Sequence, residues 1–227
     1  MNEGSETTEY VRVRTGPLWK RAKVTWVIIA MNILWYFLIE TPRGFTTGGY
    51  IASGALYRFG FDHGGWYLLF SSMFVHFDIT HILFNMVSLG SLYVIEIVIG
   101  AYPFIFLYGL SGLIGALASV WLQPYGLFGG ASGAIFGIFG VALLLSFKGV
   151  FPKGVRNQLL FWLGLNMVFD FVQPNIDIIA HLAGLGVGML GIWLLLGHRR
   201  WLKWVRYGAW IISVVGVVAL IQAAVVG

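Results

Sequence analysis

Cysteine is missing altogether from the 227 residues of this chain. Disulfides, thiolate nucleophiles and cysteine-ligated metal or haem sites are therefore excluded together, and any chemistry must use oxygen and imidazole groups. Charge is also scarce, because only 10% of the residues are Asp, Glu, Lys or Arg, against about a quarter in an ordinary soluble domain. So little charge excludes a water-soluble protein.

Apolar residues and glycine take the place of the missing charge. Hydrophobic residues make up 59% of the chain, aromatic residues make up 17%, and the mean hydropathy is +0.84. The 31 glycines suit helices that approach closely inside a bilayer, and Trp and Tyr favour the membrane interface. The composition predicts an all-α polytopic membrane protein, and its continuous hydrophobicity favours a single unit.

Seven stretches of the sequence come close to the length of about 20 apolar residues that one membrane crossing needs. We therefore predict seven spans, with a polar segment over residues 1–21 before them. The first apolar run is too long for a cleavable signal and is interpreted as a retained span. The predicted spans cover residues 22–40, 80–100, 102–122, 131–147, 157–173, 178–197 and 205–225.

The basic residues predict the orientation of these spans. If the N-terminus is cytoplasmic, 12 of the 14 Lys and Arg residues lie on the cytoplasmic side, and only Arg43 and Arg58 lie outside. This asymmetry accounts for the pI of about 9.6 without a nucleic-acid partner. We expect an integral multi-pass protein of the plasma membrane with its N-terminus in the cytoplasm.

One long connection, residues 41–79, joins the first two spans on the outer side. It mixes glycines with aromatic residues and is too broken to cross the membrane. Irregular backbone cannot face lipid tails. We therefore expect this connection to lie in the outer interface and to pack against the bundle.

Four polar residues near the outer ends of predicted spans stand out, because polar groups inside a membrane are costly and suggest function. His81 and Asn85 lie in the second span, Ser132 opens the fourth, and His181 comes early in the sixth. Even-numbered spans all run from outside to inside in this topology. The four residues should therefore share one depth, about 2 to 8 Å below the outer interface.

Each of these residues also has a purely structural interpretation. A lone Ser132 can simply allow close helix packing, His181 can make a structural hydrogen bond, and His81 with Asn85 can bond two helices together. Together, however, they provide a hydroxyl nucleophile, an imidazole base and additional donors for an oxyanion. This combination predicts acyl-transfer chemistry.

Glycines around Ser132 and His181 favour the same interpretation. Gly129 and Gly130 permit a tight turn into the helix that Ser132 opens, which leaves free N–H groups at its start. Small residues at Gly133 and Gly184 allow the fourth and sixth spans to approach each other. A Ser–His hydrogen bond requires such close contact.

Three motifs give the chain a resemblance to the rhomboid intramembrane serine proteases. They are Gly130-Ala131-Ser132-Gly133, Ala180-His181 followed by Gly184 and Gly188, and His76 with His81 and Asn85. The resemblance covers a rhomboid-like six-helix core over residues 22–200. Residues 201–227 resemble the additional C-terminal helix of some members.

The resemblance implies a role for each matching residue. Ser132 would be the nucleophile and His181 its general base, without an obligatory acid. His81, Asn85 and the backbone N–H of Ser132 would form the oxyanion hole. Phe136 would pack on the catalytic imidazole, although ordinary apolar packing explains it equally well. No cofactor or metal is implied.

The resemblance also implies transmembrane protein substrates that enter from the lipid bilayer and are cleaved near its outer face. The route would pass the fifth span and the short loop 173–177. The aromatic residues implied along this route are Phe161, Trp162, Phe169 and Phe171.

Two other features bear on the prediction. Trp66 is followed by Tyr67, where the family often has Trp-Arg, which leaves an arginine clasp in the outer loop in doubt. Glu96 lies about 22 Å deeper than His81 and cannot orient an imidazole. Asp177, four residues before His181, either caps a helix or contacts that imidazole.

Two alternatives stay open from the sequence. A non-proteolytic rhomboid-like protein that binds membrane clients would keep the fold without turnover. A transporter or channel would use buried His and Asn residues along a pathway, but its polar groups should be spread across the membrane instead of gathered at one depth.

Overall fold

The computed structural model describes residues 17–172 and 177–226. These residues are almost entirely helical, as the composition predicts, and five helical segments are long and apolar enough to cross a membrane. The chain is thus an integral membrane protein. The five segments are α1 with its continuation (Lys23–Trp35, η2 Tyr36–Glu40 and α2 Thr41–Arg43), α6 with α7 (Ile79–Ser91 and Tyr93–Ile99), α8 (Ala101–Leu122), α11 (Ile178–Gly197) and α12 (Leu202–Val226).

The other two predicted spans also form helices. α9 (Ser132–Phe147) is apolar but has only 16 residues. α10 (Lys153–Val172) has 20 residues and carries polar side chains in its first turns. A helix therefore lies at each of the seven predicted spans, but length and hydropathy support only five membrane crossings. A core of six membrane helices with one additional C-terminal helix stays a proposal.

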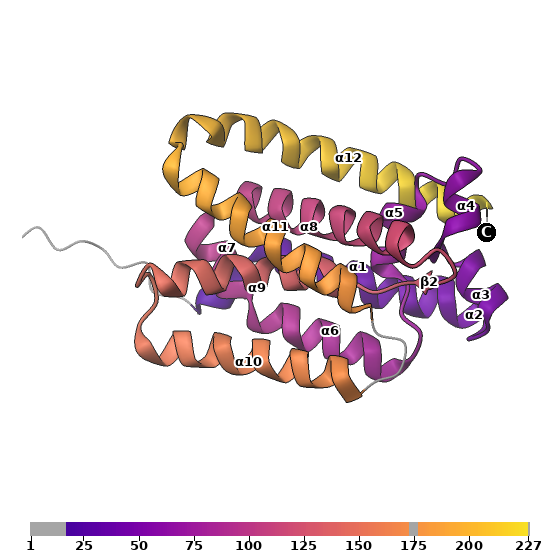
Figure 1. The fold of residues 1–227 in the computed structure, drawn as a ribbon, viewed down its shortest axis with the longest axis horizontal. Coiled ribbons are helices and arrows are strands. Elements are labelled where there is room, and N and C mark those ends of the chain that lie inside the picture. Colours follow the sequence, from indigo (N-terminus) through magenta and orange to yellow (C-terminus); the bar gives the residue numbers. More distant parts are fainter. Residues whose placement is uncertain (1–16, 173–176, 227) are drawn as a thin grey trace, which may run out of the picture.

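The connection between the first two spans is built from short elements at one end of the bundle (Figure 1). β1 pairs antiparallel with β2, with Leu56 opposite Phe128, and this pairing is not predicted from the sequence. The pair ties this connection to the segment that leads into α9. The short elements of the connection are α3 (Thr47–Ala52), β1 (Leu56–Tyr57), α4 (Arg58–Asp62), α5 (Leu68–Ser71) and η3 (Ser72–Phe74). β2 (Leu127–Phe128) belongs to the segment before α9.

Both arginines of this connection make structural contacts. Arg43 donates to the carbonyl oxygens of Ala52, at 2.7 Å, and Ala224, at 2.9 Å, and so joins the outer connection to α12. Arg58 donates to Asp62 at 2.7 Å and lies over the ring of Trp121. Tyr67 stands where the family often has an arginine, but Arg43 and Arg58 hold the outer connection from other positions.

Helices α8, α9 and α11 form the centre of the bundle, and the most extensive contact is between α9 and α11. Glycine makes it possible, because a Cβ on Gly184 would collide with the carbonyl oxygen of Gly133, and one on Gly188 with that of Gly137. The two backbones therefore touch, as small residues in membrane helices allow. We call this contact the α9–α11 seam.

The remaining helices surround this centre. α10 contacts α9 and α6 at one edge, whereas α12 lies along the opposite side against α8 and α5 (Figure 1). η1 (Leu18–Arg21) precedes α1, and η4 (Arg199–Trp201) links α11 to α12.

Glu96 joins α7 to the first turn of α1. Its carboxylate accepts the backbone N–H groups of Val24, at 3.0 Å, and Thr25, at 2.8 Å, together with the Thr25 hydroxyl at 2.7 Å. These bonds satisfy donors that a helix start leaves free. Glu96 thus has a structural partner near the other end of the bundle from the candidate catalytic residues.

Candidate active site

Ser132 begins α9 after a tight glycine turn. Gly130 adopts a φ of +125°, a backbone conformation that favours glycine, and its N–H donates to the Ser72 carbonyl at 2.9 Å. A Cβ on Gly130 would lie 2.8 Å from His81 Nε2 and 3.5 Å from Ser132 Oγ. Only glycine therefore fits between the His81 ring and the serine hydroxyl.

His181 lies in the first turn of α11, directly across the seam from Ser132. Its Nε2 is 2.6 Å from Ser132 Oγ, a hydrogen-bond distance, and its side chain is buried. Asp177 caps the start of α11 by accepting the Ala180 N–H at 3.0 Å and also accepts from Gln123 Nε2 at 3.2 Å. Of the two interpretations of Asp177, the structure supports the helix cap.

Phe136 lies one turn beyond Ser132 on α9. Its ring stacks on the His181 imidazole with centroids 4.2 Å apart and an interplanar angle of 5°. An aromatic face in this position holds the imidazole in one orientation. The contact is the one that the family resemblance implies.

His81 and Asn85 lie in the first two turns of α6, and His81 Nε2 lies beside Gly130 in the turn that leads to Ser132. Asp78 caps this helix by accepting the His81 N–H at 2.8 Å, which fixes the first turn. Asn85 is 3% exposed, and within the described residues its Nδ2 has no hydrogen-bond partner. The amide is therefore a buried donor that the described residues leave unpaired.

A cavity of about 20 Å³ lies beside Ser132, roughly the space of one water molecule. Its walls are made mainly of small residues from α8, α9, α11 and the turn before α9. They include Gly112, Gly129, Gly133 and Ala180. Two further polar residues, Ser72 and Asp177, also border it.

Glu40, which is not among the residues predicted from the sequence, supports this site from behind. Glu40 is 1% exposed, and its Oε2 accepts the backbone N–H of His76 at 2.8 Å. The His76 ring lies 5.1 Å from the His81 ring, and its Nδ1 is 3.0 Å from the Phe74 carbonyl oxygen. Burial, and then the nearby His81, lower the pKa of His76 well below its usual value, so its imidazole is neutral at pH 7. A carboxylate at the end of an apolar run is the signal that could have identified Glu40.

Metal binding has no obvious place here. Within residues 17–172 and 177–226, no three His, Cys, Asp or Glu side chains are grouped so that they could hold a metal ion. Independence from metals and cofactors stays an expectation.

The family model for the rhomboid domain matches residues 63–198, which contain Ser132, His181, His81 and Asn85. The chain belongs to the rhomboid family. Rhomboid relatives that are named as proteases support an intramembrane protease. The match begins inside the outer connection and ends between α11 and α12, so α12 lies beyond it.

Individual relatives point the same way. The chain is 34% identical to the rhomboid protease GluP of Bacillus subtilis over 71% of its own length and 32% of that protein's. It is 30% identical to the putative rhomboid protease YdcA of the same organism, over 74% of this chain and 85% of that one. It is 32% identical to the rhomboid protease GlpG of Pectobacterium atrosepticum over 53% and 45%, respectively. The chain thus matches about a third of the length of GluP.

The residues implied along a substrate route are only partly described. On α10, Phe161 is 63% exposed, whereas Trp162 packs against the core. The side chains of Phe169 and Phe171 lie outside the described residues. So do residues 173–176 of the predicted loop 173–177 and residues 1–16 of the polar segment 1–21.

Proposed function

We propose that this chain is an intramembrane serine protease that cleaves peptide bonds of transmembrane proteins near the outer face of the bilayer with a Ser132–His181 dyad. The observation that carries the proposal is the 2.6 Å distance between Ser132 Oγ and His181 Nε2 inside a membrane bundle. A hydroxyl in contact with an imidazole is the arrangement that activates a serine nucleophile.

The reaction follows from this geometry. With Nε2 unprotonated, Ser132 donates its proton to His181 while Oγ attacks the carbonyl carbon of the substrate. The imidazolium then returns the proton to the leaving amine as the C–N bond breaks, and an acyl-enzyme remains. A water molecule, deprotonated by His181, releases the acid product and restores Ser132.

The negative charge on the tetrahedral intermediate needs donors that are already in place. The backbone N–H of Ser132 is free at the start of α9, where the helix dipole favours an anion. Asn85 Nδ2 is buried and has no partner among the residues that the structure describes, and His81 Nε2 lies across Gly130 from the serine. We assign these three groups to the oxyanion hole.

The location of cleavage rests on the topology. Ser132, His181 and His81 all lie within the first turns of helices that begin at the end of the bundle carrying the outer connection. The excess of Lys and Arg at the opposite end supports a cytoplasmic N-terminus and a plasma-membrane location. Substrates would enter beside α10, whose exposed side faces lipid.

Cleavage of a single-span model substrate in liposomes tests the proposal. Ser132→Ala and His181→Ala should each lower turnover by about 10⁴-fold or more. Ser146→Ala is the matched control, because Ser146 lies near the other end of α9 and bonds only its own helix in the described contacts, at the Ala142 carbonyl. EDTA should leave turnover unchanged.

Covalent labelling separates a protease from the other two interpretations. A fluorophosphonate should label the wild type and Ser146→Ala, and it should label neither Ser132→Ala nor His181→Ala. Equal labelling of Ser132→Ala, or substrate binding without any cleavage by the wild type, would refute the dyad. The second result would favour a client-binding protein.

A further inference from the structure

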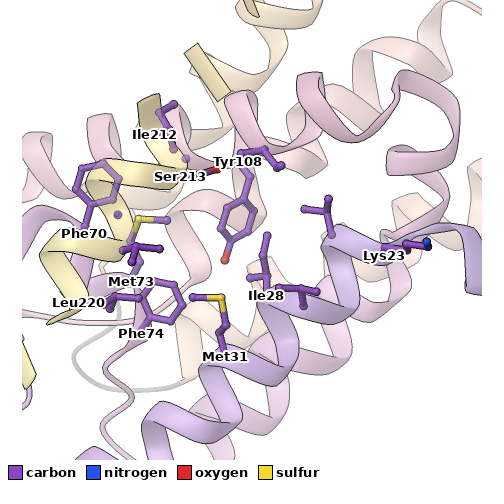
Figure 2. A pocket seen from close by; sticks show the side chains of 16 residues that line it. Lys23, Ile28, Met31, Phe70, Met73, Phe74, Tyr108, Ile212, Ser213 and Leu220 are labelled. Atoms are coloured by element: carbon purple, nitrogen blue, oxygen red, sulfur yellow. The ribbon is translucent and has the colours of Figure 1, made fainter. Parts of the chain in front are cut away.

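A groove unrelated to the candidate active site runs between α1 and α12. It has a volume of about 350 Å³, with α8 and the α5–η3 segment as its floor (Figure 2). We call it the α1–α12 groove. Its wall is almost wholly apolar and includes Val27, Met31, Met73, Ile105, Val217 and Leu220.

An empty groove of this kind is unfavourable within a bilayer. Apolar walls do not hold ordered water, and atoms that face a void lose their dispersion contacts. The volume lies in the range of small-molecule sites. A hydrocarbon chain from the surrounding lipid is the occupant that these walls fit.

Charge at one end of the groove specifies the lipid further. Lys23 borders the groove and is exposed, and no ion pair of Lys23 occurs among residues 17–172 and 177–226. The carboxylate of Glu96 is instead bonded to Val24 and Thr25. None of the described residues that line the groove is acidic, so the field at this end favours an anionic headgroup.

A second polar group in the wall also lacks a partner. The side chain of Tyr108 is 5% exposed, and its hydroxyl has no hydrogen bond among the described residues. Figure 2 shows the ring extending from α8 into the groove with its hydroxyl toward Ile28. A lipid ester oxygen could accept this hydrogen bond, whereas an acyl chain alone would leave the donor unpaired.

We propose that the α1–α12 groove binds one anionic phospholipid, with its phosphate at Lys23 and an acyl chain between α1 and α12. The lipid fills the space between these helices and so helps to hold α12 against the rest of the bundle. The site is independent of the proposed protease activity, because none of the groove residues belongs to the candidate active site.

Native mass spectrometry of the full chain tests this proposal. The protein is reconstituted in vesicles of phosphatidylglycerol and phosphatidylcholine and then extracted in mild detergent. The wild type should retain one phosphatidylglycerol. Lys23→Gln should lower the preference for phosphatidylglycerol about fivefold, and Ser213→Leu, which places bulk in the groove, should abolish retention of both lipids.

Two matched variants control for general effects. Lys203→Gln removes a cation that lies over the Trp204 ring outside the groove, and Val214→Leu adds bulk on an exposed position next to Ser213. Both should behave as the wild type. If Lys203→Gln changes the preference as much as Lys23→Gln does, or if Ser213→Leu retains as much lipid as Val214→Leu, the lipids are merely annular and the proposal is wrong.

Discussion

The α9–α11 seam and helix α10 represent two kinds of packing in one bundle. At the seam, glycines bring two backbones into contact, and the Ser132–His181 hydrogen bond lies at its end. α10 presents much of its surface outward, and Gly164 on it has open space where a Cβ would be. The candidate catalytic pair is thus held by backbone contact, and the contrast predicts that α10 separates from the bundle more easily than the two helices of the seam.

α6 touches both regions, which makes the contrast sharper. Its first two turns carry Asn85 and also His81, which lies beside the Gly130 turn that leads to Ser132. One turn further on, Ser88 donates to Asn166 Oδ1 of α10 at 2.9 Å. This bond joins two otherwise apolar surfaces, and Asn166 is buried. One helix thus supplies the proposed oxyanion donors and the polar contact with α10.

The largest expected effect comes from breaking the seam. Gly188→Ala would drive its Cβ into the Gly137 carbonyl, and backbone on both sides leaves little room for adjustment. We expect a loss of about 3 kcal/mol or more in the free energy of unfolding, measured by denaturant titration in detergent, and loss of proteolysis. Gly186→Ala is the control, because a Cβ there meets nothing within 4 Å. Equal stability of the two variants would contradict close backbone packing.

The proposed oxyanion donors should have the next largest effect. Asn85→Ala and His81→Ala should each lower turnover about 10²- to 10³-fold, since the nucleophile and base remain. Thermal stability should stay close to that of the wild type and of Ser91→Ala, a control on the same helix. If either variant unfolds while its remaining folded molecules turn over normally, these residues join helices, and the oxyanion hole lies in the backbone at Ala131 and Ser132.

The place of the site follows from the sequence, but its detailed geometry does not. Because the second, fourth and sixth predicted spans all run from outside to inside, α6, α9 and α11 should begin at the same end of the bundle. The structure has them there. The Ser132–His181 distance depends on how far the two helices approach, which glycine permits but does not determine. The stacking of Phe136 could not be told from ordinary packing before the structure.

The helix positions also follow from hydropathy, whereas their interruptions do not. α8 and α11 lie within one residue of the predicted spans, but α10 begins at Lys153, before the predicted residue 157. The break at Leu92 between α6 and α7 has no proline to indicate it. The β1–β2 pair has two residues in each strand, too few for a periodic pattern. The α1–α12 groove depends on tertiary packing alone.

The stacking of Phe136 on His181 offers a milder change at the end of the seam. Phe136→Leu keeps the apolar volume but removes the flat face that holds the imidazole, so kcat should fall about three- to tenfold. Phe139→Leu is a control on the same helix, because Phe139 contacts Phe136 and is buried. Steady-state cleavage kinetics would check this. If the two variants have the same kcat, the stacked ring does not position the base.

The smallest expected effect comes from loosening α10. Asn166→Ala removes the acceptor of the Ser88 hydroxyl, and such hydrogen bonds between membrane helices contribute about 0.6 kcal/mol. If substrates enter beside α10, easier separation of this helix from α6 should raise turnover about threefold, the rate equivalent of that energy. Ser88→Ala should give the same increase, and the double variant should add nothing, because all three lose the bond between α6 and α10, whereas the bond from Asn166 Nδ2 to the Trp162 carbonyl lies within α10. Asn157→Ala, at an exposed position of α10, should leave turnover unchanged. A fall in turnover for Asn166→Ala and Ser88→Ala would instead mean that α10 must stay in place for cleavage, and the contrast between a fixed seam and a movable α10 would fail.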